Sequence, residues 1–157
     1  MEQESLQIFD NNKYVMTMST IVKILILLII NTSFSDAQEI KQDITVSITG
    51  LDSNRGQLLV GLYNTEEHFL DKRFMSEIVE ISNKTGTLVF TNIPKGTYAI
   101  SFIHDENSNG KMDTNFLGIP KEDYGCSNNA RGTLGPPKWK DAKFELKGQD
   151  KVITISL

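Results

Sequence analysis

The most strand-like stretch of the chain is TYAISFI, at residues 97–103. It is rich in β-branched and aromatic residues, which favour the pleated backbone of a strand. Side chains of a strand alternate between its two faces. We therefore expect Tyr98, Ile100 and Phe102 to share one face and to pack into a core. The preceding residues 92–96 contain a proline and a glycine at places that suit a tight turn.

Shorter strand patterns lie on both sides of this stretch. They occur at residues 44–49, 58–62, 78–81, 87–90, 144–146 and 152–155. Turn-forming clusters at residues 50–56 and 83–86 separate some of them, and residues 65–74 fit either a short helix or a loop. No long amphipathic helix and no alternation of strands with helices is visible. The patterns predict an all-β fold, a single β-sandwich of about seven strands with one long ordered loop.

The first part of the chain has the pattern of a secretory signal peptide. A lysine-containing stretch leads into an apolar run at residues 24–30, and small residues up to Ala37 follow. We predict a signal peptide at residues 1–37, export to the periplasm or the extracellular space, and a mature domain at residues 38–157 without a membrane span. An uncleaved N-terminal anchor is the alternative, although the run is shorter than the ~20 apolar residues of a membrane span.

Composition excludes some classes of function. The chain has 157 residues and a net charge of -4, and no block of lysine and arginine appears, so we expect no nucleic-acid partner. The lone cysteine, Cys126, cannot form an internal disulfide, and the fold must therefore depend on its apolar core. A catalytic thiol needs an activating base, and neither His68 nor His104 lies near Cys126 in the sequence.

No periodic pattern is visible from residue 105 to residue 141. This segment is rich in glycine, asparagine, proline and aspartate. An irregular stretch of this length is unusual inside a compact domain and is mostly functional or disordered. Tyr124 and Trp139 disfavour disorder, since aromatic side chains in such loops line a binding cleft or, more often, anchor the loop to the core. We therefore expect an ordered loop.

The segment begins with DENSNGKMD, at residues 105–113. Oxygen-bearing side chains stand at positions 1, 3, 5 and 9 and a glycine at position 6, as in the first nine places of an EF-hand-type calcium loop. A hard cation needs six to eight oxygens at ~2.3–2.6 Å, so the chain must wrap around it. The pattern predicts a calcium site. Its ligands would be Asp105, Asn107, Asn109 and Asp113 through side chains and Lys111 through its carbonyl.

One ligand of that pattern is missing. Position 12 is Phe116, so Glu122 or Asp123 would have to supply the remaining oxygen, and we take Glu122 as the sixth ligand. With few carboxylates the affinity should be weak, in the range of about 10⁻⁴–10⁻³ M of extracellular calcium modules. Zinc is not expected because no cluster of histidine and cysteine exists. The alternative is an ion-free Asn-Gly turn in which these side chains bond to their own backbone.

The chain resembles the bacterial DUF2141 family. The resemblance lies in Asn92–Ile100, His104–Asn107, Asn109–Asp113, Gly118–Glu122, Tyr124-Gly125, Ser127–Asn129 and Gly135–Pro137. It implies an exported protein and brings no assigned biochemical activity. The turn Pro94-x-Gly96-x-Tyr98 also resembles those of prealbumin-like and carboxypeptidase-regulatory β-sandwiches, which implies an Ig-like or prealbumin-like fold and no function. Cys126 stands where the family string leads us to expect an aromatic residue.

Two hypotheses for the function follow. The leading one is an exported, non-enzymatic domain that calcium stabilises and that acts as a binding or structural envelope module with an unknown protein or glycan partner. The alternative is a hydrolase that uses the loop at residues 104–122, with Asp105, Glu106 and Glu122 as acid/base groups. The sequence has no nucleophile motif of the Gly-x-Ser-x-Gly type. His104 and Asp105 are neighbours, and neighbours on a strand point to opposite faces. The two side chains should therefore diverge, which favours a structural role for His104.

Overall fold

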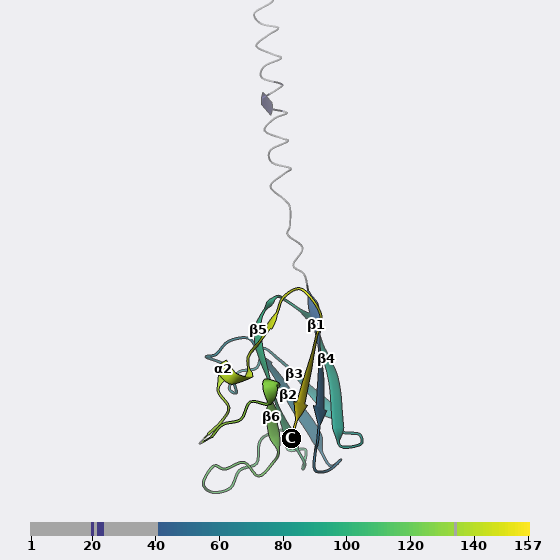
Figure 1. The fold of residues 1–157 in the computed structure, drawn as a ribbon, viewed down its shortest axis with the longest axis vertical. Coiled ribbons are helices and arrows are strands. Elements are labelled where there is room, and N and C mark those ends of the chain that lie inside the picture. Colours follow the sequence, from purple (N-terminus) through teal and green to yellow (C-terminus); the bar gives the residue numbers. More distant parts are fainter. Residues whose placement is uncertain (1–19, 21, 24–40, 134) are drawn as a thin grey trace, which may run out of the picture. The chain divides into compact units, whose positions relative to one another are not determined.

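A computed structural model describes residues 20, 22–23, 41–133 and 135–157 (Figure 1). The expected signal segment at residues 1–37 lies outside the described residues, apart from the helical Thr20, Val22 and Lys23. Among the described residues, none belongs to a helix that has the length and apolar character to cross a membrane. Glu39–Leu157 form a compact unit by themselves.

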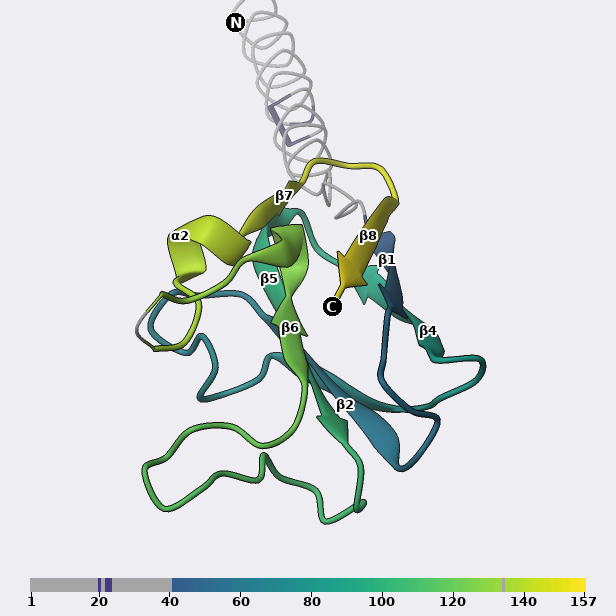
Figure 2. The ribbon, with the colours of Figure 1, turned by 60° about the horizontal axis from the view of Figure 1, so that its bottom comes forward.

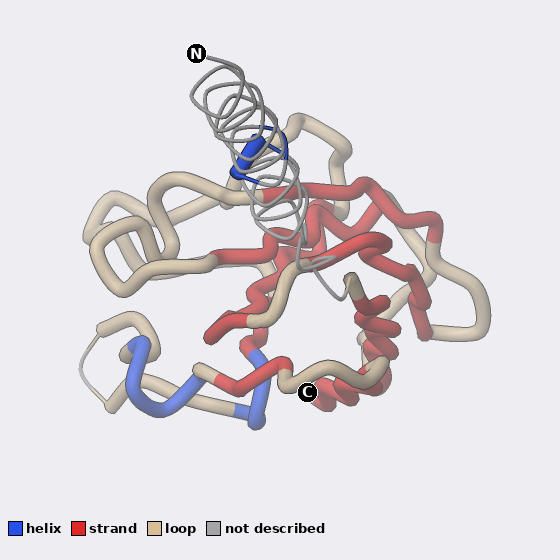
Figure 3. The backbone as a smooth tube through the Cα atoms, turned by 90° about the horizontal axis from the view of Figure 1, so that it is seen from above, coloured by secondary structure: helices blue, strands red, loops and turns tan. Residues whose placement is uncertain are grey.

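The unit is built almost entirely from strands. They are β1 (Gln42–Thr49), β2 (Gln57–Tyr63), β3 (Met75–Glu80), β4 (Thr85–Ile93), β5 (Gly96–Asp105), β6 (Tyr124–Cys126), β7 (Phe144–Leu146) and β8 (Lys151–Ser156). Two short helical turns, η1 (Ser127–Asn129) and α2 (Trp139–Ala142), lie on one side of the strands (Figure 3). The predicted all-β sandwich is confirmed. The described residues hold one strand more than the seven expected, namely β6, which lies within the segment where no periodic pattern is visible.

The strands form two sheets. One sheet has the order β4-β1-β8, with β1 antiparallel to β4 and parallel to β8. The other has the order β3-β2-β5-β6. β7 pairs with the first residues of β5, and β6 pairs with later residues of the same strand. Figure 2 shows β8 beside β1 and the long connection from β5 to β6 extending past the strands. Asn83 and Lys84, both with positive φ, make the tight turn between β3 and β4 that the sequence indicated.

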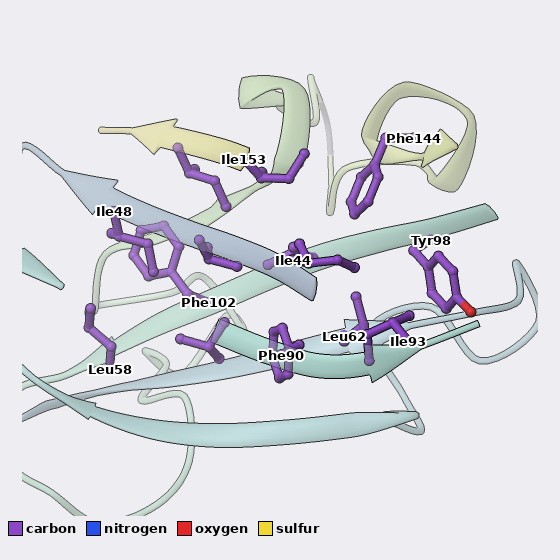
Figure 4. Packing of buried hydrophobic residues seen from close by; sticks show 14 of the residues in the cluster. Ile44, Ile48, Leu58, Leu62, Phe90, Ile93, Tyr98, Phe102, Phe144 and Ile153 are labelled. Atoms are coloured by element: carbon purple, nitrogen blue, oxygen red, sulfur yellow. The ribbon is translucent and has the colours of Figure 1, made fainter. Parts of the chain in front are cut away.

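The core lies between the two sheets. Tyr98, Ile100 and Phe102 belong to one buried cluster, as the alternation of β5 predicted. From the facing sheet, β1 contributes Ile44 and Ile48, both without exposed surface (Figure 4). Burial of each side chain of this size stabilises the fold by about 1.5–3 kcal/mol. The apolar core thus holds the domain together without a disulfide, since Cys126 is a free thiol.

The outer face of β2 and β5 is also covered, which the alternation of Leu58, Val60 and Leu62 did not predict. Tyr63 and Ala99 pack there with Cys126, Trp139 and Ala142 in a second cluster. The ring of Phe69, from the loop at residues 64–74, contacts Tyr63 and Trp139 edge-on at centroid distances of 5.4 and 5.6 Å. Trp139 therefore anchors the long segment to the sheet, as one of the two roles proposed for it.

Ser127 fastens this anchor to the core. It is fully buried, and its hydroxyl donates to the carbonyl of Ala142 at 2.6 Å. The same hydroxyl oxygen accepts the backbone N–H of Ile100 at 3.0 Å. One side chain therefore satisfies polar groups of both α2 and β5, and it attaches the irregular segment to the core at residue 127.

We expect Ser127→Ala to lower the free energy of unfolding by about 1–3 kcal/mol, because a buried N–H and a buried carbonyl would lose their partner. Denaturant-induced unfolding of the chain from residue 38 onward measures this change. Ser156→Ala is the matched control, since Ser156 is exposed and its hydroxyl makes no hydrogen bond within the described residues. Equal losses for the two variants would contradict the anchoring role of Ser127.

Candidate metal centre

The pairing of β2 with β5 fixes the first residue of the predicted calcium loop. Gln57 lies opposite Asp105, and its Nε2 donates to Asp105 Oδ2 at 2.9 Å. Gly56 has a φ of +70°, and a Cβ at this residue would lie only 2.0 Å from the Asp105 carbonyl oxygen. Only glycine allows the two strands to approach this closely here. Asp105 is fully buried, so position 1 of the loop is held by the sheet.

The carboxylate of Asp105 also shapes the turn that follows. Its Oδ1 accepts the backbone N–H of Asn109 at 3.0 Å, and its Oδ2 accepts that of Gly110 at 2.8 Å. Gly110 has a φ of +81°, a region that favours glycine. The backbone therefore folds back over the Asp105 carboxylate.

The side chains at positions 3, 5 and 9 of the loop meet. Asn107 Nδ2 donates to Asp113 Oδ2 at 2.7 Å, and Asn109 Nδ2 donates to Asp113 Oδ1 at 3.0 Å. The amide oxygens of the two asparagines accept the backbone N–H groups of Asn109 and Lys111. These contacts are also those of an ion-free turn. An amide oxygen has two lone pairs, however, so each keeps one for a further donor or a cation.

Glu122 closes the loop from outside it. Its Oε1 accepts the backbone N–H of Glu106 at 3.1 Å, and its Oε2 accepts that of Asp113 at 2.9 Å. The other candidate for the missing ligand, Asp123, meets the sheet through its backbone carbonyl, which accepts the N–H of His104. Of the two acids, Glu122 is the one whose carboxylate reaches both ends of the loop.

Phe116, at position 12, belongs to a separate turn. It is 94% exposed. The side chain of Asn115 holds this turn, because its Oδ1 accepts the backbone N–H groups of Leu117 and Ile119 at 2.9 and 3.0 Å. A bridge between Thr114 and Pro120 closes it. The segment after the loop therefore presents exposed apolar side chains on a hydrogen-bonded turn.

The two acids at the start of the loop, Asp105 and Glu106, have pKa values that favour their ionised forms. Burial of Asp105 acts to raise its pKa, but hydrogen bonds from Gln57 and from backbone N–H groups outweigh this and hold the pKa below its usual value. The hydroxyl of Ser53 and the nearby Arg55 lower the pKa of Glu106. A general acid needs a raised pKa. His104 is buried, and its Nε2 lies 2.9 Å from the Arg55 carbonyl oxygen. This contact gives His104 a structural role.

The described residues contain no group of three or more histidine, cysteine, aspartate or glutamate side chains spaced to hold a metal ion. Calcium also takes oxygens from amides and backbone carbonyls. An ion at this loop would therefore depend on Asn107, Asn109 and the Lys111 carbonyl besides the carboxylates. All of these donors are oxygens, which suits a hard cation and not zinc.

Two parts of this arrangement have no signal in the sequence. Gln57 stands at the start of a strand 48 residues before Asp105, and only the register of the sheet brings the two together. Glu106 is held by Ser53 and Arg55 in the same way, with an Arg55 Nη2 to Glu106 Oε2 distance of 2.9 Å. Long-range pairing of this kind cannot be read from local spacing.

Cys126 is a packing residue in this structure. It has no exposed surface, and burial raises the pKa of its thiol to about 12. The thiolate is the nucleophilic form of cysteine, and little of it exists at neutral pH when the pKa is this high.

The thiol should not react with Ellman's reagent in the folded protein near neutral pH, and should react stoichiometrically after unfolding in guanidinium chloride. Both reactions are followed by absorbance of the released thiolate. Rapid reaction of the native protein would show that Cys126 is accessible and would contradict its assignment to the core.

No curated protein and no solved structure matches the chain, so the likeness to prealbumin-like sandwiches stays a prediction. The model of one protein family does match, over residues 46–154. This range runs from within β1 to within β8 and includes the whole loop and the anchor at Ser127. The chain therefore belongs to the DUF2141 family, described as an uncharacterized protein conserved in bacteria.

Proposed function

We propose that residues 38–157 act as an exported, non-enzymatic module that calcium stabilises and that binds a protein or glycan partner or supports the cell envelope. The observation that carries the proposal is the meeting of Asn107, Asn109 and Asp113 inside a loop that Glu122 closes. The ion's ligands would be Asp105, Asn107, Asn109, the Lys111 carbonyl, Asp113 and Glu122.

Electrostatics supports a cation at this place. Asp113 is now paired with two neutral amide N–H donors. A divalent cation would interact with the same carboxylate more strongly, and the amide groups would turn their oxygens toward it. Asp105 and Glu122 bring two further carboxylates to the loop. Because two of the ligands are neutral amides, the affinity should stay in the range of about 10⁻⁴–10⁻³ M that suits calcium outside the cell.

The ion would connect to partner binding through the turn that follows the loop. Phe116, Leu117 and Ile119 are 94, 68 and 55% exposed. Exposed apolar side chains grouped in this way are typical of an interaction surface. Calcium bound at residues 105–113 would hold the near end of the turn, and Glu122 holds its far end. The turn would thus be presented in one conformation.

We expect calcium to bind the chain from residue 38 onward with a stoichiometry of one, measured by calorimetric titration after treatment with a chelator. At a concentration ten times the dissociation constant, calcium should stabilise the fold by about 1.4 kcal/mol and raise the melting temperature by several degrees. Absence of both heat and a melting shift at millimolar calcium would refute the ion, whatever the partner.

Two isosteric variants test the ligand set. Asp113→Asn and Glu122→Gln each remove one charge and should weaken calcium binding about ten-fold or more, which corresponds to one lost charged ligand. Asp123→Asn is the matched control, because the Asp123 side chain makes no hydrogen bond within the described residues. A larger effect of Asp123→Asn than of Glu122→Gln would assign the sixth ligand to the other acid.

A further inference from the structure

A cavity of about 760 Å³ lies on the outer face of β2 and β5. Leu59, Tyr63, Ser101 and Ile103 form its floor, where the two strands pair. One wall comes from the turn at residues 117–120, and the other from residues 132–133 and 135–137. This volume falls within the range of about 300–1,000 Å³ that is usual for small-molecule sites.

The register of the two strands gives the floor a polarity. At one end Leu59 pairs with Ile103, and both side chains are apolar. At the other end Gly61 pairs with Ser101, and the Ser101 hydroxyl donates to the hydroxyl of Tyr63 at 3.3 Å. The four residue steps from Leu59 to Tyr63 span about 13 Å of strand. The floor of the cavity therefore has an apolar end and a hydroxyl-bearing end.

Arg73 brings a positive charge to the hydroxyl-bearing end. Its Cγ and Cδ would each lie 3.0 Å from a Cβ on Gly61, as would the hydroxyl of Tyr63. A glycine inside a strand weakens it and often marks a place of close approach, and here it leaves room for the stem of Arg73. The Arg73 side chain makes no hydrogen bond and no ion pair with the residues that the structure describes. Its charge is therefore available to a ligand.

We propose that this cavity binds a small amphipathic molecule that carries one anionic group, with a medium-chain carboxylate as the representative chemistry. The anionic group pairs with Arg73 and the hydroxyls of Tyr63 and Ser101. The apolar body lies over Leu59 and Ile103. Charge complementarity favours an anion over other occupants, because only an anionic group pairs with the guanidinium and a cationic molecule would be repelled. The proposal does not depend on calcium at the neighbouring loop.

The test uses 8-anilinonaphthalene-1-sulfonate, a fluorescent aromatic anion, with the chain from residue 38 onward, which carries both sheets and both hydrophobic clusters. The dye should bind the folded protein with a stoichiometry of one, and decanoate should displace it at lower concentration than decanol, with decylamine the weakest. The titrations are run both with a chelator and with calcium. Absence of calcium binding can then be distinguished from absence of ligand binding in the cavity.

Three substitutions, at the neighbouring basic residues Arg73 and Lys72, provide the comparison. Arg73→Met should weaken displacement by decanoate about ten-fold or more, the effect of one lost charged hydrogen bond, and should leave decanol unchanged. Lys72→Met removes the same charge next to the cavity without lining it and should have no effect. Arg73→Lys keeps the charge and should retain part of the affinity. Melting curves check that each variant is folded.

Four results would overturn the proposal. The first is absence of saturable dye binding to the folded protein, and the second is equal weakening by Arg73→Met and Lys72→Met. The third is displacement by decylamine as effective as that by decanoate. If sedimentation shows that the protein dimerises and that dimerisation excludes the dye, this face is an interface between copies and the ligand proposal is also overturned.

Discussion

The pairing of β2 with β5 is the constraint on which the rest of the structure depends. Its register runs from Gln57 opposite Asp105 to Tyr63 opposite Ala99. On the inner face it places Leu58, Val60 and Phe102 in the main core, and on the outer face it forms the floor of the cavity. At its end it ties the first residue of the Asp105–Asp113 loop to the sheet. One set of backbone hydrogen bonds thus positions the core, the loop and the cavity.

The long connection after β5 is ordered because it is held at several places. The carboxylates of Asp105 and Glu122 accept hydrogen bonds from backbone N–H groups of the loop. These N–H groups therefore have partners without regular secondary structure. Ser127 and Trp139 then attach the following residues to β5 and to the outer face. Each contact answers the same requirement, that backbone polar groups removed from water need partners.

The candidate cation loop and the candidate ligand cavity are adjacent, since Met112 of the loop also lines the cavity. Residues 117–120, which form a wall of the cavity, come after the loop in the chain. Glu122 follows them, and its carboxylate accepts the backbone N–H of Asp113. The loop concentrates carboxylates, whereas the cavity has Arg73 at its hydroxyl-bearing end, with no partner for its charge among the described residues. The loop therefore favours cations and the cavity favours anions, so the two sites would not compete for one ligand. Because they are adjacent, an ion in the loop would affect the shape of the cavity.

Local patterns in the sequence were sufficient for every strand except β6, for the inner face of the core and for the oxygen spacing of the loop. Ile44, Ile100 and Phe102 lie inside as alternation predicted, because the period of a strand is set by its own backbone. The contact of Gln57 with Asp105 and the burial of the outer face around Tyr63 came only from the tertiary structure. So did the place of Arg73 over Gly61. These depend on strand register and on which distant segments pack together, and both are fixed by long-range contacts that local spacing does not encode.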